Sequence, residues 1–173
     1  MAVSSAHGDV SGLTGHLSIG PPTVDDGVQC WQLAVESTEL DVNSRYAYLL
    51  WCRDFAATSV VARTEQDAVA GFVTGYLRPD APGTLVVWQV AVASQARGRG
   101  VATAMLDALL AQVTAADHVE TTITPDNDAS MRLFTGFARR HGAGVERREL
   151  FGSELLGGDH LPEILHRIGP VRS

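Results

Sequence analysis

Two glycines and two arginines stand in a short turn of this sequence, at a place where a phosphate could bind. Residues 84–92, just before the turn, have the composition of a β-strand, and an amphipathic, helix-like run follows it. Gly98 and Gly100 lack a Cβ, which lets the backbone approach a bulky ligand closely. Unpaired N–H groups at a helix N-terminus attract phosphate, and Arg97 and Arg99 add positive charge. A phosphate-bearing ligand is therefore predicted here, with a solvated glycine turn as the alternative.

Two common phosphate-binding motifs do not fit this turn. A dinucleotide-binding G-x-G-x-x-G motif requires a third glycine, and Thr103 occupies that position. A Walker P-loop requires G-K-[ST] after four intervening residues, and the sequence has none. The pattern that remains is Q-x-x-G-x-G-x-A, beginning at Gln95.

The composition is that of an ordinary globular protein. With 173 residues the chain suits one domain, and 45% of its residues are hydrophobic and 19% charged. A net charge of −7 argues against a nucleic-acid partner, which would require a basic face. No apolar stretch is long enough to cross a bilayer and no secretory signal opens the chain, so we expect no membrane partner and a cytoplasmic location. Cys30 and Cys52 are expected to pack as small apolar residues in a reducing compartment.

The elements that position this turn are predicted from periodicity and turn residues. Residues 1–15 are rich in Ser, Gly and Ala and predict a disordered tail, which leaves one domain over residues 16–173. Thr23 is a candidate N-cap for a first helix, and Ser44 for a second one. The remaining expected elements, in chain order, are a first strand at 17–19, a hairpin of 58–63 and 69–77, a breaker cluster at 78–83, a central strand at 85–92, a helix at 101–114, a strand at 118–124, a helix from 125, and strands at 145–151 and 163–168.

The turn and this order of elements resemble the GNAT N-acetyltransferases. The resemblance implies an α/β (α+β) fold with a mixed, mostly antiparallel central sheet of about seven strands, flanked by about four helices. It also implies that the loop amides bind the pyrophosphate of acetyl-CoA, and that the preceding strand binds its pantetheine arm. The cofactor-binding residues so implied are Val90, Ala91, Val92, Gln95, Arg97, Gly98, Arg99, Gly100, Val101, Ala102, Thr103, Asn127 and Phe134.

A second motif agrees with this family and departs from it at one position. Asn127, Ser130 and the Leu133-Phe134 pair stand where many members have N-x-x-A-x-x-L-Y. The tyrosine of that pattern protonates the leaving thiolate, and a phenyl ring has no proton to give. Either another group supplies the proton, or none is needed, because a thiolate with a pKa of about 8.5 is a good leaving group.

Three segments narrow the resemblance to the L-2,4-diaminobutyrate acetyltransferases of ectoine biosynthesis. They cover residues 41–50, 87–92 and 120–128, and residues 159–163 also fit. The resemblance implies transfer of an acetyl group to the 4-amino group of L-2,4-diaminobutyrate, giving 4-N-acetyl-L-2,4-diaminobutyrate, an osmoprotectant precursor.

The predicted substrate carries two ammonium groups and a carboxylate, so it requires acidic partners and a donor. Asp41 and Glu163 can bind the ammonium groups by charge-assisted hydrogen bonds. Tyr46 offers a hydroxyl and Trp88 a ring face for a cation. His160 can act as donor, acceptor or base near neutral pH, and Asn127 completes the predicted substrate-binding set. Each of these side chains could instead serve only in packing, capping or solvation.

The predicted reaction is direct transfer in a ternary complex. Glu163 is the first candidate for the base and His160 the second, while Asp41 orients the substrate. A backbone N–H near Val92 is expected to stabilise the oxyanion. The spacing of His160, Glu163 and His166 does not predict a metal site, because Pro162 disturbs a helix there and no fourth ligand is apparent.

Other functions remain open at this stage. They are an acetyltransferase for another small amine, a non-catalytic acyl-CoA sensor, and a scaffold whose loop binds nothing. A homodimer is expected through an edge strand near the C-terminus.

Overall fold

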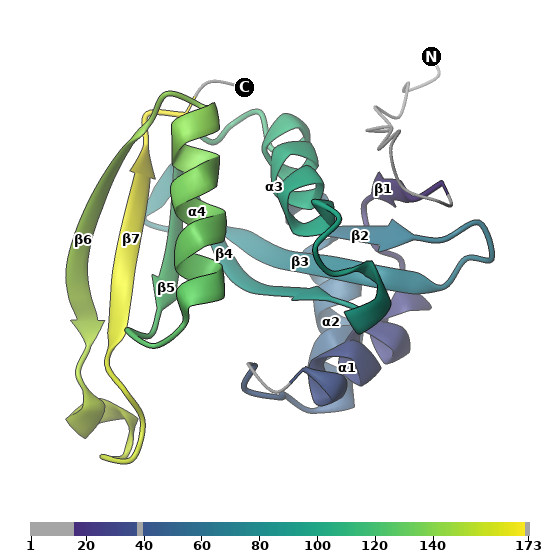
Figure 1. The fold of residues 1–173 in the computed structure, drawn as a ribbon, viewed down its shortest axis with the longest axis horizontal. Helices are drawn as coiled ribbons and strands as arrows, with labels where there is room; N and C mark the ends of the chain where they lie inside the picture. Colours follow the sequence, from purple (N-terminus) through teal and green to yellow (C-terminus); the bar gives the residue numbers. More distant parts are fainter. Residues whose placement is uncertain (1–15, 38–39, 172–173) are drawn as a thin grey trace. The chain divides into compact units, whose positions relative to one another are not determined.

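The computed structural model describes residues 16–37 and 40–171, with seven β-strands and four α-helices in that part of the chain (Figure 1). The predicted disordered tail, residues 1–15, lies outside the described residues. The strand order is β1-β2-β3-β4-β5-β7-β6. β4 pairs with β5 in parallel, whereas β1 with β2, β2 with β3, β5 with β7 and β6 with β7 are antiparallel. The predicted mixed, mostly antiparallel sheet is therefore confirmed.

The chain divides into two compact units. Of the described residues, the first contains 16–37, 40–76 and 89–113, and the second contains 77–88 and 114–171. The elements that begin in the first unit are β1 (Ser18–Gly20), α1 (Asp26–Glu36), α2 (Arg45–Asp54), η1 (Ala56–Thr58), β2 (Val60–Arg63), β3 (Val69–Arg78), η2 (Ser94–Ala96) and α3 (Val101–Gln112). Those that begin in the second are β4 (Ala81–Val92), β5 (His118–Ile123), α4 (Asp128–Arg140), β6 (Gly144–Phe151), η3 (Ser153–Leu156) and β7 (Glu163–Gly169).

In the first unit, helices cover both faces of the strands. A Cβ at Gly71 of β3 would meet the side chain of Met105 on α3, whereas the next residue, Phe72, packs against Tyr48 of α2. Successive strand residues point to opposite faces, so α3 covers one face and α2 the other, as Figure 1 also shows. The core between them is apolar, and Val60, Val61 and Val73 are buried.

The predicted cap of the first helix is wrong, and the second is confirmed. Thr23 does not cap α1; its N–H and hydroxyl donate to the carboxylate of Asp26, at 2.6 and 3.0 Å, because Asp26 is buried and also bound by Arg63. At α2, the Ser44 hydroxyl accepts a hydrogen bond from the N–H of Ala47 at 3.2 Å.

α1 and α2 pack closely through small residues. A Cβ at Gly27 would lie 2.9 Å from the Leu49 side chain and 3.0 Å from its Cα. Cys30 and Cys52 are free thiols buried in the same core, as expected. A hydrogen bond to Cys52 and burial both raise the pKa of Cys30, so this thiol stays protonated.

In the second unit, the predicted breaker cluster is much shorter than expected. β3 continues to Arg78 and β4 begins at Ala81, so only residues 79 and 80 form the turn, while Pro82 and Gly83 lie within the strand. Proline is tolerated near the start of a strand, which explains why the cluster does not end the pairing earlier.

Candidate functional site

The predicted phosphate loop follows β4 and leads into α3 in the first unit. Gly98 and Gly100 have φ angles of 73° and 77°, in the left-handed region that glycine adopts without strain. Gly100 is the N-cap of α3 and has no side chain to cap the helix. Residues 97–100 are exposed, so the turn is open to a ligand.

The backbone N–H groups of this loop point to anion binding. The first hydrogen bond of α3 runs from Ala104 N–H to the Gly100 carbonyl, at 2.9 Å. Residues 97–100 form a turn, and within the described part of the chain the N–H groups of residues 98–103 make no well-aligned hydrogen bond to a protein acceptor. Such N–H groups, together with the positive end of the helix dipole, form an anion site.

Arg97 has a structural contact that the sequence did not reveal. Its Nε donates to the carbonyl of Val92, at 3.1 Å, so the side chain ties the loop back to the end of β4. Arg99 and Gln95 are exposed in the same turn. Both arginines therefore belong to the same turn as these N–H groups and add positive charge to it.

The strand positions predicted to bind pantetheine lie close against β3. Ala91 is buried, Val90 and Val92 are half-buried, and the N–H of Ala93 bonds to the Ala70 carbonyl at 2.8 Å. A Cβ at Gly71 would lie 2.9 Å from the Ala91 carbonyl oxygen. Gly71 thus permits this close approach, a role that the sequence analysis missed.

The pairing of β5 changes along its length in the second unit. β4 and β5 are in register from Thr84 with His118 to Val86 with Glu120. β5 is in register with β7 over a longer stretch, from Val119 to Ile123. The C-terminal residues of β5, 121–123, therefore pair with β7, whereas the pairing of β5 with β4 in this unit ends at Glu120.

The predicted acceptor residues divide between the two units. Asp41 and Tyr46 belong to the first, in the loop before α2 and in its first turn, and both are exposed, Tyr46 by 68%. Trp88, His160 and Glu163 belong to the second.

In the second unit, His160 and Glu163 are the two candidate bases. His160 Nδ1 lies 2.6 Å from the Leu161 carbonyl, and because a carbonyl only accepts, Nδ1 carries the hydrogen. In the neutral ring Nε2 is then the acceptor, the form that a base requires. Glu163 is half-buried as the first residue of β7, and Trp88 is 43% exposed on β4.

Asn127 and Phe134 have clear structural roles. The Asn127 side chain caps α4 by accepting from Ser130 N–H at 2.9 Å. Phe134 is 3% exposed on the buried face of α4, beside Phe137 and Ala138.

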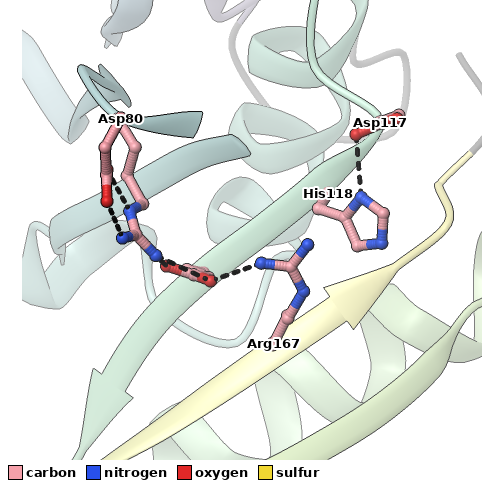
Figure 2. Close-up of polar contacts among 6 residues, drawn as sticks. Asp80, Asp117, His118 and Arg167 are labelled. Atoms are coloured by element: carbon pink, nitrogen blue, oxygen red, sulfur yellow. Dashed lines mark hydrogen bonds and ion pairs between the residues drawn. The ribbon is translucent and has the colours of Figure 1, made fainter. Parts of the chain in front are cut away.

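Sequence reasoning missed two polar networks. In the first unit, the buried Gln89 joins Tyr48 to the backbone of Asp41. In the second, the carboxylate of Glu120, which is buried, accepts from Arg78 at 3.1 Å and Arg167 at 2.8 Å (Figure 2). For Gln89 the available signal was a polar residue inside the apolar run of β4, whereas Glu120 lies among other polar residues of β5 and gave no comparable signal.

The described residues contain no group of three His, Cys, Asp or Glu side chains arranged to hold a metal ion. His166 is buried, and its Nδ1 bonds to the Ile164 carbonyl. None of the described helices is long and apolar enough to cross a membrane.

Comparison with known protein families identifies the family of this chain. Residues 26–137, which include the glycine loop and the cap of α4, match the model of the acetyltransferase (GNAT) family. The chain belongs to this GNAT family. The GNAT loop expected from Q-x-x-G-x-G-x-A is therefore the segment that connects β4 to α3.

Several GNAT relatives carry one name. An L-2,4-diaminobutyric acid acetyltransferase of Streptomyces anulatus is 59% identical over 158 residues, covering 89% of this chain and 90% of the relative. One from Halomonas elongata is 45% identical, covering 91% and 83%. Among solved GNAT structures, diaminobutyrate acetyltransferase EctA from Paenibacillus lautus, in complex with its substrate L-2,4-diaminobutyric acid and coenzyme A, superposes with a TM-score of 0.86 at 35% identity. That match covers 92% of this chain and 98% of the other.

Proposed function

We propose that this GNAT enzyme transfers the acetyl group of acetyl-CoA to the 4-amino group of L-2,4-diaminobutyrate, in ectoine biosynthesis. The observation that carries the proposal is the 59% identity to a relative of that name over 89% of the chain. The likeness to a structure that holds diaminobutyrate and coenzyme A supports it.

The cofactor side of the proposal uses the loop and the strand before it. The N–H groups of residues 98–103 bind the pyrophosphate, with Arg97, Arg99 and Gln95 around it. The backbone of residues 90–92 binds the pantetheine arm. The unpartnered loop N–H groups support this assignment, since acetyl-CoA brings the acceptors that they lack.

The acceptor side uses carboxylates for a dicationic substrate. Asp41 and Glu163 bind the two ammonium groups, and Tyr46 and Trp88 contact the substrate through a hydroxyl and a ring face. Asn127, at the start of α4, contacts both diaminobutyrate and acetyl-CoA. Phe134, on the same helix, contacts acetyl-CoA. Tyr46 is 68% exposed, which supports its availability to a ligand, and Asp41 and Trp88 are also exposed.

The chemical steps follow from these groups. Glu163 takes a proton from the 4-ammonium group, with His160 Nε2 as the second candidate. The neutral amine forms a bond to the thioester carbonyl carbon, and a backbone N–H near Val92 stabilises the oxyanion. The C–S bond then breaks, the coenzyme A thiolate leaves with the electron pair, and the amide nitrogen loses its second proton to water. Phe134 donates no proton, so the thiolate leaves unprotonated or takes a proton from water.

We propose a cytoplasmic homodimer as the working form. β6 is the last strand in the sheet order and has one neighbour, β7, which leaves an edge for a second copy. Charged side chains along β6, including Glu146 and Arg148, oppose direct edge pairing, so a second copy would be recognised through charge pairs. Light scattering coupled to size exclusion tests the dimer: a single peak at the mass of one chain contradicts it.

The function is tested by incubating the enzyme with acetyl-CoA and a panel of amines. Diaminobutyrate, a polyamine, an aminoglycoside and a peptide N-terminus are compared by thiol release, and the product is mapped by NMR. The proposal predicts that diaminobutyrate has the highest kcat/KM and that only its 4-nitrogen is acetylated. A higher kcat/KM for another amine, or binding of acetyl-CoA without thiol release, overturns it.

A further inference from the structure

Gln89 is a buried amide in an otherwise apolar strand. It is 6% exposed, and its neighbours in β4, Val87 and Ala91, are buried apolar residues. A side-chain amide has two donor hydrogens and an oxygen with two lone pairs. Burying it costs free energy unless these groups form hydrogen bonds. Its retention here requires an explanation in terms of its partners.

Both ends of the Gln89 amide are partnered within the first unit. Nε2 donates to the Asp41 carbonyl at 2.9 Å, and the Tyr48 hydroxyl donates to Oε1 at 2.9 Å. Because a carbonyl only accepts, the nitrogen must face Asp41, so the orientation of the amide is fixed. The backbone N–H of Gln89 is separately bound to the Thr74 hydroxyl, at 3.2 Å.

Tyr48 makes a second connection to the same loop. Burial raises the pKa of Tyr48 and outweighs the opposite effect of its contacts with Asn43 and Gln89. The phenol therefore stays protonated and continues to donate to Gln89. The loop that carries Asp41 and Asn43 is thus connected to β4 through the Gln89 amide directly and through Tyr48.

We propose that Gln89 is a positioning residue that sets the Asp41 carboxylate for the diamine substrate, an inference that rests on the proposed function. Gln89 directly precedes residues 90–92, so one strand places both the pantetheine-binding backbone and the acceptor loop. Asp41 itself is exposed, and its backbone carbonyl accepts from the buried Gln89 amide at 2.9 Å and from the Asn43 side chain at 3.5 Å. Fixing that carbonyl fixes the Cα from which the carboxylate extends.

The test separates positioning from a general loss of structure. Gln89→Met keeps the length of the side chain and removes both hydrogen bonds. We expect KM for diaminobutyrate to rise by about tenfold, the order expected for one lost hydrogen bond, and KM for acetyl-CoA to change by less than about twofold. Backbone amides of residues 41–43 should exchange with deuterium faster, by a similar factor, without any substrate present.

Two further variants serve as controls. Tyr48→Phe removes one connection and leaves the Gln89–Asp41 bond, so a smaller rise in diamine KM is expected. Thr74→Val removes the partner of the Gln89 backbone and leaves the amide contacts, so Tm should fall while diamine KM stays unchanged. In an Asp41→Asn background, Gln89→Met should add less than about twofold to diamine KM, because the group that it positions is already lost.

Three results overturn the inference. They are an equal rise in both KM values, a full additional effect of Gln89→Met in the Asp41→Asn background, and unchanged amide exchange at 41–43. If Gln89→Met does not fold, Tyr48→Phe with the exchange measurement decides the matter. If the parent enzyme does not acetylate diaminobutyrate, only the proposed function is overturned, because the exchange measurement requires no substrate.

Discussion

At the residue scale, the proposed reaction depends first on which group takes the proton. Glu163 begins β7 and is half-buried. Glu163→Gln keeps the shape and removes the base, so kcat/KM should fall by about 10²-fold or more. Glu65→Gln, the same change at an exposed position in the turn between β2 and β3, is the control and should leave the rate unchanged. Steady-state kinetics with a Glu163→Gln value within a few-fold of the parent would assign the base elsewhere, with His160→Ala as the next variant to measure.

Phe134 gives a second prediction at this scale. If the thiolate leaves without an acid, Phe134→Tyr should change kcat by less than about twofold. The ring is 3% exposed, so the added hydroxyl should lower the free energy of unfolding by roughly 1–3 kcal/mol. Pre-steady-state thiol release and urea unfolding measure the two effects. A several-fold increase in kcat would mean that protonation of the thiolate limits the parent enzyme.

At the element scale, the loop between β4 and α3 makes a prediction that separates binding from strain. Gly100→Ala places a Cβ on a left-handed residue, which should cost about 1 kcal/mol of stability, and it also crowds the loop N–H groups. We expect the Kd for coenzyme A to rise about tenfold or more. Gly142→Ala is the matched control, because Gly142 has a φ of 61° with open space around it, in the turn after α4. Calorimetry showing equal losses of affinity in both variants would contradict the assignment.

How far the elements follow from sequence depends on the kind of signal. The amphipathic run of α3 and the hairpin of β2 and β3 were predicted because periodicity and turn residues are local. The cap of α1 was predicted wrongly. Thr23 binds the carboxylate of Asp26, which also binds Arg63, a residue 37 positions away in the sequence. The same limit applies to the site: the glycine loop is a local motif, whereas the Gln89 and Glu120 networks join strands and loops that only the fold brings together.

At the scale of the whole molecule, one ion pair links stability to pH. Burial acts to raise the pKa of Asp26, but hydrogen bonds from Arg63 and Thr23 outweigh it, so this pKa lies below its ordinary value. A carboxylate with a lowered pKa stabilises the native state above its unfolded pKa of about 4, and this contribution is lost as the pH falls through the folded-state pKa.

This linkage predicts the behaviour of Asp26→Asn. The variant should lose roughly 2 kcal/mol of unfolding free energy at pH 7, and the difference from the parent should shrink as the pH falls below about 4. Asp25→Asn, at the exposed neighbouring residue, should show neither effect. Urea unfolding between pH 3 and pH 7 makes the comparison. A difference that stays constant over this range would show that the carboxylate charge of Asp26 does not contribute.

The account as a whole is tested most directly by a crystal structure of the enzyme with coenzyme A and diaminobutyrate bound. It predicts pyrophosphate oxygens about 3 Å from N–H groups of residues 98–103, and carboxylates of Asp41 and Glu163 at the two amino groups, with Glu163 at the 4-amino nitrogen directly or through one water. A loop without pyrophosphate, its N–H groups bonded to the protein itself, or a diamine bound away from both carboxylates, would contradict it.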